Sequence, residues 1–486
     1  MSEQDHLAQL RAEALRIAGY AGPVAATAPA PYDFAFTEDA LALRLVAALD
    51  NRARYVAPWS AWYLYDGTRW REDSTLGMYD AARRICRDLA DTAKADPALT
   101  EAERNKIVTR LRQAGTVAAV ERMARSDRAV VASVDQWDAD PWLLNTPAGV
   151  VDLTTGTMRE HRPDDHMTKI TAVAPGGDCP LWQRFLHRVT AGDEALRAYL
   201  QRLAGYALTG STREHVLPFA HGPGGNGKGV FIGAVSGAMG DYHRAAPIET
   251  FAASSTDRHP TELAMLRGAR LVTAQETEEG RRWAESRIKS LTGGDRITAR
   301  FMRQDFFEFD PQFTLLIAGN HKPGLRSVDE AIRRRFHLIP FNVTIPAAER
   351  DEQLPERLKD EWPGILAWMI DGALAWQRDS LAPPPAVTAA TDAYLDGQDA
   401  IGAWLAECCD CTDADAWTAT NDLYSNFKLW AERAGEFVLP RARFLDALET
   451  RRMRPHRQNN KRGFMGVRIV PQAAHAFPPV NYGRTA

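Results

Sequence analysis

The sequence predicts an α/β protein, and three observations predict it. A short apolar stretch at 216–220 leads into a glycine-rich run at 221–230, and a helical stretch at 231–239 follows. Two further short apolar stretches, 270–274 and 314–318, each end at polar residues. Buried parallel strands are apolar runs of this length, and helices connect them. We therefore expect a parallel sheet with a glycine-rich loop at the end of one strand.

Length and composition describe a folded chain of several domains. The chain has 486 residues, which corresponds to about three domains. A hydrophobic fraction of 45% and a charged fraction of 25% are ordinary for soluble globular proteins. No apolar run approaches the roughly 20 residues that span a bilayer, and the N-terminus lacks the features of a secretory signal. We therefore expect a cytoplasmic protein with no membrane partner.

The N-terminal part of the chain predicts a flexible arm and a first domain. Residues 1–33 are rich in Ala and Pro, as linkers are, and a globular domain is expected at 34–185. Aromatic residues surround the turn at 66–67, which predicts a β-hairpin. Helices at 79–95 and 101–126 and two short strands within 143–153 are expected to follow.

The remaining chain predicts a core and a smaller C-terminal domain. The core is expected at 186–346, a helical collar with a proline-rich linker at 347–385, and the last domain at 386–486. The net charge of −4 is uneven, because 437–486 holds ten Lys or Arg and two Asp or Glu, so the preceding residues carry −12. A local basic surface predicts a nucleic-acid contact, and a solvated basic face is the alternative.

The glycine-rich loop predicts a nucleotide triphosphate site. Glycines let several backbone N–H groups face one anion, the helix N-terminus adds a positive dipole end, and Lys228 adds a full charge. The P-loop pattern has Ser or Thr after this lysine, where Gly229 stands here. A glycine turn with an incidental lysine is the alternative. The expected ATP-binding residues are Gly222, Gly224, Gly225, Asn226, Gly227, Lys228 and Gly229.

Polar residues that follow the two later strands predict the reaction chemistry. Glu276 can hold Mg²⁺ through water or polarise an attacking water, and Asn320 can bond the γ-phosphate or that water. In isolation, a surface carboxylate and a turn-forming Asn are equally good interpretations. Three successive arginines precede the apolar stretch at 336–341, and Arg334 and Arg335 could reach a neighbouring subunit's phosphates as arginine fingers.

These motifs together resemble the superfamily 3 helicases of the phage/plasmid and poxvirus-type primase-helicase family, over about 34–470. The resemblance implies an AAA+-type core, an N-terminal helicase-associated domain of α+β type, a hexameric ring around DNA and ATP hydrolysis between subunits. Gly229, and Gln275 where relatives often have a second acid, depart from the pattern and bear on how Mg²⁺ is held. The matching segments are GGNGKG, RLVTAQETE, IKSLTGGDRITARFMR, FTLLIAGNHKP, DEAIRRRFHLIPF and DPWLLNTPAGVVDLTTG.

The resemblance also assigns roles to individual residues. It makes Lys228 the phosphate-binding lysine, Glu276 the Walker B acid, Asn320 the sensor, and Arg334 or Arg335 the finger. It further implies a hairpin that projects into the ring channel, where basic side chains would track the DNA backbone. The residues expected there are Lys289, Arg300 and Arg303, with pairing to Asp295 or Asp305 as the structural alternative.

The C-terminal domain is expected to end as a winged helix. A helical stretch is followed by a basic turn at 451–463 and an apolar strand at 464–470. Phosphate contacts from such a turn position a protein on DNA without reading its sequence. The residues expected to make these contacts are Arg451, Arg452, Arg454 and Arg457.

The leading hypothesis is a ring-forming, ATP-dependent DNA helicase for phage, prophage or plasmid replication in a bacterial host cell. We expect ATP and Mg²⁺ as cofactors, and single-stranded and forked DNA as partners. Only about 33 residues precede the first domain, so a standalone helicase is expected, with priming supplied by a separate protein. The alternatives are an ATP-gated origin-binding initiator or loader without unwinding activity, and a scaffold that does not hydrolyse ATP.

Overall fold

The computed structural model divides the chain into two compact units, Met1–Trp137 and Asp138–Ala486. Residues 138–185, expected in the first domain, therefore lie in the second unit. None of the described helices is long and apolar enough to cross a membrane. The structure describes residues 36–252, 261–276, 283–302, 305–325, 329–397, 399–434, 438–451, 453–458 and 460–470.

The first unit combines helices with a three-stranded antiparallel sheet. The expected hairpin forms, because the Asp66 carboxylate accepts hydrogen bonds from the N–H groups of Thr68 (2.8 Å) and Arg69 (2.9 Å). The helix expected at 101–126 is two helices, since Gln113 is extended between them with φ −77° and ψ 139°. The elements are α2 (Glu38–Ala48), β1 (Ala53–Val56), β2 (Ala61–Tyr65), β3 (Trp70–Glu72), α3 (Gly77–Ala95), α4 (Glu101–Leu111) and α5 (Ala114–Ala124).

A five-stranded parallel sheet forms the centre of the second unit, as the sequence predicts. Its strand order is β13-β7-β12-β9-β8, so the first strand of the sheet, β7, lies between two of the later ones. The chain therefore leaves β7 in one direction and leaves β12 in the other, and ligands bind α/β sheets at such reversals. The strands are β7 (Leu217–His221), β8 (His243–Ala245), β9 (Leu271–Glu276), β12 (Thr314–Gly319) and β13 (Phe336–Pro340).

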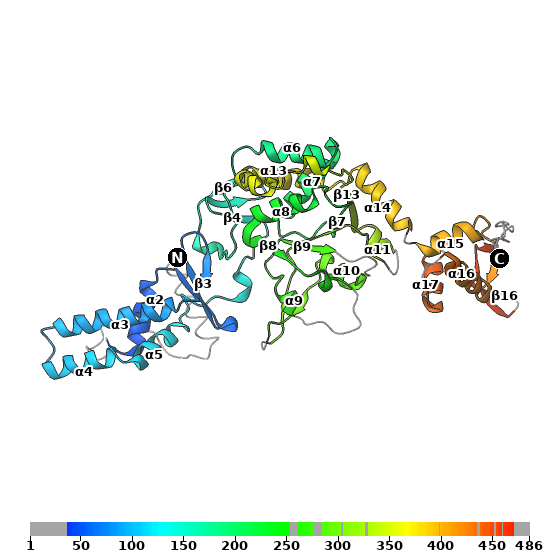
Figure 1. Ribbon diagram of the computed structural model, residues 1–486. Coiled ribbons are helices and arrows are strands. Elements are labelled where there is room, and N and C mark those ends of the chain that lie inside the picture. The colour runs from blue at the N-terminus through cyan, green and yellow to red at the C-terminus, as the bar shows by residue number, and fades with distance from the viewer. Residues whose placement is uncertain are drawn as a thin grey trace, which may run out of the picture. The chain divides into compact units, whose positions relative to one another are not determined.

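Alternate side chains of these strands enter two separate cores. In β12, Leu315 and Ile317 pack on one face, whereas Leu316 and Ala318 pack on the other. Figure 1 shows α7, α8 and α13 stacked on one side of the sheet and α10 and α11 on the other. The covering helices are α6 (Pro180–Val189), α7 (Glu194–Tyr206), α8 (Lys228–Met239), α9 (Thr261–Ala264), α10 (Glu285–Gly293), α11 (Glu330–Arg333) and α13 (Trp362–Asp379).

Buried Arg270 ties the start of the second unit to this sheet. Its guanidinium donates to the carbonyl oxygens of Leu208 (2.7 Å), Leu143 (2.7 Å) and Asp140 (3.2 Å). It also lies 4.6 Å from the centre of the Tyr242 ring. Three short strands follow this attachment point: β4 (Leu143–Thr146), β5 (Gly149–Asp152) and β6 (Thr157–Arg159).

The core continues beyond the proline-rich segment at 383–385. Helix α14 (Pro385–Gly397) packs on β13, where the Thr391 hydroxyl accepts the Leu338 N–H at 2.9 Å. Tyr394 and Leu395 are buried against the same sheet. Proline at the first turn is compatible with a helix, so Pro385 begins α14 rather than separating two domains.

The C-terminal part is built from three helices and short antiparallel strands. Trp404, Phe427 and Phe444 form its buried aromatic core. Figure 1 shows this group of elements at the end of the coloured chain. The elements are α15 (Ala400–Cys408), β14 (Cys409–Asp410), β15 (Trp417–Ala419), α16 (Thr420–Ala434), α17 (Arg441–Thr450), β16 (Arg454–Gln458), β17 (Lys461–Met465) and β18 (Arg468–Ile469).

Candidate functional site

The glycine-rich loop connects the carboxyl end of β7 to the first turn of α8. Gly225 and Gly227 have φ angles of 72° and 87°, which only glycine adopts at little cost. A Cβ at Gly227 would lie 2.5 Å from Val189 Cγ1 and 3.0 Å from Phe185 Cε2. Helix α6 therefore supports the loop from behind, and no larger residue fits at this position.

Lys228 projects from the first residue of α8 back into the loop. Its ammonium donates to the carbonyl oxygens of Gly222 (2.6 Å) and Pro223 (3.4 Å) and to the side-chain oxygen of Asn226 (3.1 Å). It also donates to the side-chain oxygen of Asn320 at 3.1 Å. Burial lowers the pKa of this lysine. The structure thus brings together two side chains that the sequence places 92 residues apart.

Three neighbouring strands end at the same level beside the loop. Gly319 at the end of β12 is in register with His221 of β7 on one side and Glu276 of β9 on the other. A Cβ at Gly319 would lie 2.9 Å from Phe219 Cζ and 3.0 Å from Glu276 Cβ, so the close approach requires glycine. Glu276 is buried at this edge. The predicted lysine, asparagine and glutamate sites therefore meet at one edge of the sheet.

Sequence reasoning missed Gly319 and His221 as parts of this edge. Burial, followed by the nearby charges of Lys322 and Lys228, lowers the pKa of His221. A Gly-Asn pair after an apolar strand is an ordinary turn signal, so the sequence shows no sign that Gly319 is required for strand packing. The position of His221 before the first loop glycine was the available signal.

The residues around the loop would suit a magnesium ion whose ligands are mainly phosphate oxygens and water. Glu276 supplies a carboxylate, and Gly229 supplies no side-chain ligand. Mg²⁺ keeps several waters and usually takes one or two carboxylates plus substrate phosphates, so a missing hydroxyl does not prevent its binding. A Cβ at Gly229 would meet nothing within 4 Å, so the site has room for a larger residue there.

The predicted finger arginines lie at the opposite edge of the sheet. They directly precede β13, whose first residue, Phe336, is in register with Leu217 at the start of β7. Four residues of strand, or about 13 Å, separate that level from the loop end of β7. Arg334 is exposed, and Arg335 donates to the Ala331 carbonyl oxygen at 2.9 Å. Neither can reach the glycine-rich loop of its own chain from this position.

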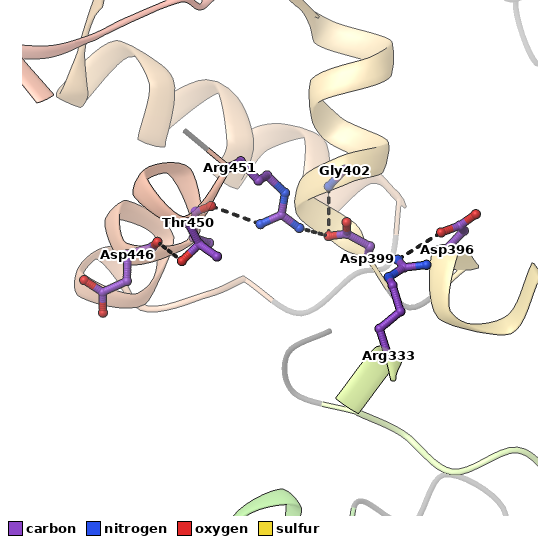
Figure 2. A network of polar contacts seen from close by, with 8 residues as sticks. Arg333, Asp396, Asp399, Gly402, Asp446, Thr450 and Arg451 are labelled. Atoms are coloured by element: carbon purple, nitrogen blue, oxygen red, sulfur yellow. Dashed lines mark hydrogen bonds and ion pairs between the residues drawn. The ribbon is translucent and has the colours of Figure 1, made fainter. Parts of the chain in front are cut away.

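The third arginine of the run has a structural partner. Arg333 pairs with Asp396 at 3.1 Å and lies 3.9 Å from Asp392, both on α14. Figure 2 shows the guanidinium of Arg333 directed at Asp396. This pair joins α11 to α14, which distinguishes Arg333 from the exposed Arg334.

Strands β10 (Ile297–Ala299) and β11 (Phe307–Phe309) pair antiparallel in the segment where the resemblance implies a hairpin. Arg300 lies over the ring of Phe306 at 4.7 Å. Lys289 pairs with Asp329, the N-cap residue of α11, rather than with the two aspartates considered above. Arg303 lies outside the described residues. The DNA roles of these three basic residues remain predictions.

Exposed apolar side chains lie near the ends of β10 and β11 that face residues 303–304 in the sequence. Phe301, Met302 and Phe306 are 38%, 69% and 59% exposed. Aromatic side chains at such positions can stack on unpaired bases. These three side chains are therefore candidates for base stacking, if this hairpin contacts nucleic acid.

The basic C-terminal residues have different surroundings. Arg454 and Arg457 are exposed on β16, where every residue is exposed. Arg451 instead pairs with Asp399 at 2.5 Å and donates to the Ala447 carbonyl oxygen at 3.0 Å, and Figure 2 shows its link to Asp399. Arg452 lies outside the described residues.

The neighbouring strand β17 adds two residues of the basic stretch that are not among the four expected phosphate contacts. Lys461 and Arg462 are exposed and in register with Gln458 and Arg457. Strands β16 and β17 thus form a ribbon with four exposed cations, which we call the basic ribbon: Arg454, Arg457, Lys461 and Arg462.

Two family models match the chain. The model described as D5 N terminal like matches residues 42–191, and a family of unknown function (DUF5906) matches residues 220–335. The second match begins at the end of β7 and ends at Arg335, so it includes the loop, both later strand ends and α11.

Viral proteins are similar to this chain at low identity. "Putative helicase L207/L206" of Acanthamoeba polyphaga mimivirus is 26% identical over 351 residues, which is 66% of this chain and 36% of that protein. "Putative helicase 022R" of Frog virus 3 is 26% identical over 49% of this chain and 26% of its own length. "Putative helicase 184R" of Invertebrate iridescent virus 6 is 25% identical over 61% and 35%. The chain thus spans about a third or less of the length of these relatives.

Solved structures are also similar to the chain. The apo structure of NrS-1 C terminal region (305-718) has a TM-score of 0.47 and 10% identity, covering 88% of this chain and 99% of that one. The A form apo structure of NrS-1 C terminal region-CTR has a TM-score of 0.43 and 11% identity, covering 71% and 74%.

Proposed function

We propose that this protein is an ATP-dependent DNA helicase with a replicative role, built on an AAA+-type core and active as a ring of identical subunits. The observation that carries the proposal is the meeting of Lys228, Asn320 and Glu276 at one edge of the parallel sheet. The two family models and the viral relatives support a viral helicase or primase type of family.

The proposed mechanism assigns one task to each side chain at this edge. When ATP binds, the Lys228 ammonium leaves its neutral oxygen partners and pairs with the negatively charged β- and γ-phosphates. Asn320, exposed and already bonded to Lys228, orients the γ-phosphate or the attacking water. Glu276 accepts a proton from that water or polarises it. Glu276 would also hold Mg²⁺ through water, and the bound ion would supply positive charge that offsets the charge of the phosphates.

Hydrolysis in this proposal needs a cation from a neighbouring subunit. Arg334 is exposed, and about 13 Å of strand separates it from the level of the glycine-rich loop in its own chain. It lies at the opposite edge of the sheet, which another subunit could approach. Its guanidinium would stabilise charge on the phosphoryl group in the transition state. The DNA would contact the β10–β11 hairpin tip and the basic ribbon.

The experiment that tests the proposal compares Lys228→Ala with wild type. We expect ATP hydrolysis to fall by roughly 10²–10³-fold or more, as when a preorganised charge-stabilising group is removed. Displacement of one strand from a forked duplex should be lost with it. Lys359→Ala is the matched control, because Lys359 is an exposed lysine that pairs with Glu356 outside the site. Wild-type turnover by the Lys228 variant would overturn the proposal.

An ATP-gated DNA-binding initiator or loader is a second candidate function. The basic ribbon favours it, because its exposed cations could hold DNA whether or not duplex is opened. The forked-duplex assay separates the two functions. ATP-dependent DNA binding with hydrolysis and no strand displacement would support the loader.

A further inference from the structure

The chain that follows β13 returns over the glycine-rich loop. The Phe341 N–H donates to the His221 carbonyl oxygen at 2.7 Å, and the Phe341 carbonyl oxygen accepts the Asn226 side-chain amide at 2.8 Å. The Ile345 N–H donates to the Gly225 carbonyl oxygen at 2.9 Å. Three hydrogen bonds therefore fix this returning segment, 341–350, against the loop.

The returning segment ends with an arginine whose guanidinium lies against the loop. A Cβ at Gly225 would lie 2.7 Å from Arg350 Cζ and 3.0 Å from its Nε, which places this guanidinium directly against the loop backbone. Nε donates to the Ile345 carbonyl oxygen at 2.9 Å, which directs the planar group. The preceding Glu349 pairs with Arg188 of α6 at 2.6 Å. The cation is thus held at the loop by its own segment.

We infer that Arg350 binds the phosphates of the nucleotide in the same chain, as a second cation beside Lys228. The inference rests on the proposed function and names a contact to the phosphates that neither the family models nor the motifs assign. Nε is bonded to Ile345, and neither terminal nitrogen has a hydrogen-bond partner within the part of the chain that the structure describes, so both can donate to phosphate oxygens from the plane of the guanidinium. Arg350 is exposed, so a phosphate can approach it without displacing a buried group.

This role differs from that of a finger arginine in its kinetic signature. Arg350 lies at the loop of its own chain before any reaction, so it would bind the ground state and the transition state alike. Removing such an interaction raises KM and leaves kcat nearly unchanged, whereas removing Arg334 lowers kcat. The two arginines can therefore be told apart in one assay.

The test measures the affinity of Arg350→Ala for a fluorescent ATP analogue with Mg²⁺, together with KM and kcat. We expect about tenfold weaker binding and a similar rise in KM, with kcat within twofold of wild type. Arg357→Ala is the matched control, because Arg357 is an exposed arginine of the neighbouring helix α12 (Leu354–Arg357) that pairs with Asp351 at 2.7 Å. Its affinity should match wild type.

Two further outcomes separate the possible failures. If wild type binds the analogue and Arg350→Ala binds it equally well, this inference fails and the proposed function stands. If wild type binds no nucleotide, the proposed function itself fails. Arg350→Lys keeps the charge without the planar donors and should fall between wild type and the alanine variant, whereas equal binding by all three would show a packing role only. Should the alanine variant unfold, Arg350→Gln, which keeps a polar stem, gives the same comparison.

Discussion

Lys228 is held only by neutral oxygens, which leaves its charge available for an anion. Four carbonyl or amide oxygens surround the ammonium, and among the described residues no carboxylate is paired with it. Hydrogen bonds from a charged donor to phosphate are stronger than those to neutral oxygens. The ammonium is therefore positioned before ATP binds, and replacing its neutral partners with phosphate oxygens costs little free energy.

Gly229 offers a direct test of the missing hydroxyl. We expect Gly229→Ser to fold, because a Cβ there meets nothing within 4 Å, and to be more stable by roughly 0.5 kcal/mol from helix propensity. A serine hydroxyl can bind Mg²⁺, so half-maximal hydrolysis should need less of the metal. Titration of ATPase activity with Mg²⁺ measures this, with Gly233→Ser on the same helix, also unobstructed, as the control. An unchanged Mg²⁺ requirement would mean that the hydroxyl has no role here.

His337 makes stability depend on pH. Burial lowers its pKa to about 4 from an ordinary 6.5, and the Tyr199 hydroxyl lies 2.8 Å from its Nδ1. The unfolded chain therefore takes up a proton at higher pH than the folded one, so this stability is present above pH 6.5 and is lost as the pH falls towards 4. The loss should reach about 2–3 kcal/mol, because one pKa unit corresponds to roughly 1.4 kcal/mol.

Denaturant unfolding between pH 7.5 and 4.5 checks this expectation. His337→Gln should lose less stability across that range than wild type, so the two curves converge at low pH. If both proteins respond to pH in the same way, the dependence comes from other groups.

At the scale of elements, the basic ribbon should bind DNA through phosphates alone. Its four cations are exposed on two paired strands. Each lost contact between a cation and a DNA phosphate reduces the slope of log binding constant against log salt concentration, the salt slope, by about 1. Replacing Arg454, Arg457, Lys461 and Arg462 with Gln should weaken DNA binding most at low salt and flatten its salt dependence. Fluorescence anisotropy with labelled DNA over a salt series measures both effects.

Arg451 provides the contrast for this experiment. Its pair with Asp399, the N-cap residue of α15, joins α17 to α15, so Arg451→Gln should reduce stability and leave the salt slope nearly unchanged. If the ribbon variant has the same salt slope as wild type, the basic ribbon is a solvated surface that does not contact DNA.

The hairpin tip should act on bases rather than on phosphates. Phe306→Ala removes an exposed ring that Arg300 covers, and base–aromatic stacking contributes about 1–3 kcal/mol per base. We expect strand displacement to fall while ATP hydrolysis without DNA stays normal. Leu429→Ala, which removes an exposed apolar side chain of α16, is the control. If the Phe306 variant displaces strands as well as wild type does, the Phe306 ring does not contact the DNA bases.

The sequence predicted the sheet and its edge because those features depend on local patterns. Apolar runs of strand length and a glycine-rich loop specify β7, β9 and β12, and each predicted strand-end residue lies at the edge. The partners of Lys289 and Arg451 could not be predicted, because ion pairs depend on which helices pack together. For the same reason, the sequence does not predict that α14 belongs to the core, because its apolar residues pack against β13, which is distant in the sequence.

At the scale of the whole molecule, the proposed site combines Lys228 of one chain with Arg334 of another. Mixing Arg334→Ala subunits with Lys228→Ala subunits should restore part of the ATP hydrolysis that each lacks, because some interfaces regain both residues. An arginine finger contributes roughly 10³–10⁵ in rate, so even a small share of restored interfaces is measurable. Arg335→Ala should reduce activity less, because its side chain already bonds Ala331. Mixed assemblies that form and stay inactive would contradict a shared site.

The buried guanidinium of Arg270 determines where the polypeptide can be cut. Two of its three carbonyl partners belong to residues 140 and 143, which precede the glycine-rich loop by about eighty positions. A fragment that begins after the first family match, near residue 192, would keep only the Leu208 carbonyl of these three partners, and losing two hydrogen bonds to a charged group costs on the order of 3 kcal/mol. A fragment that begins at Asp138 keeps all three. Truncation at the unit boundary should therefore yield a soluble, cooperatively folding piece, while truncation at the family boundary should yield an aggregating one.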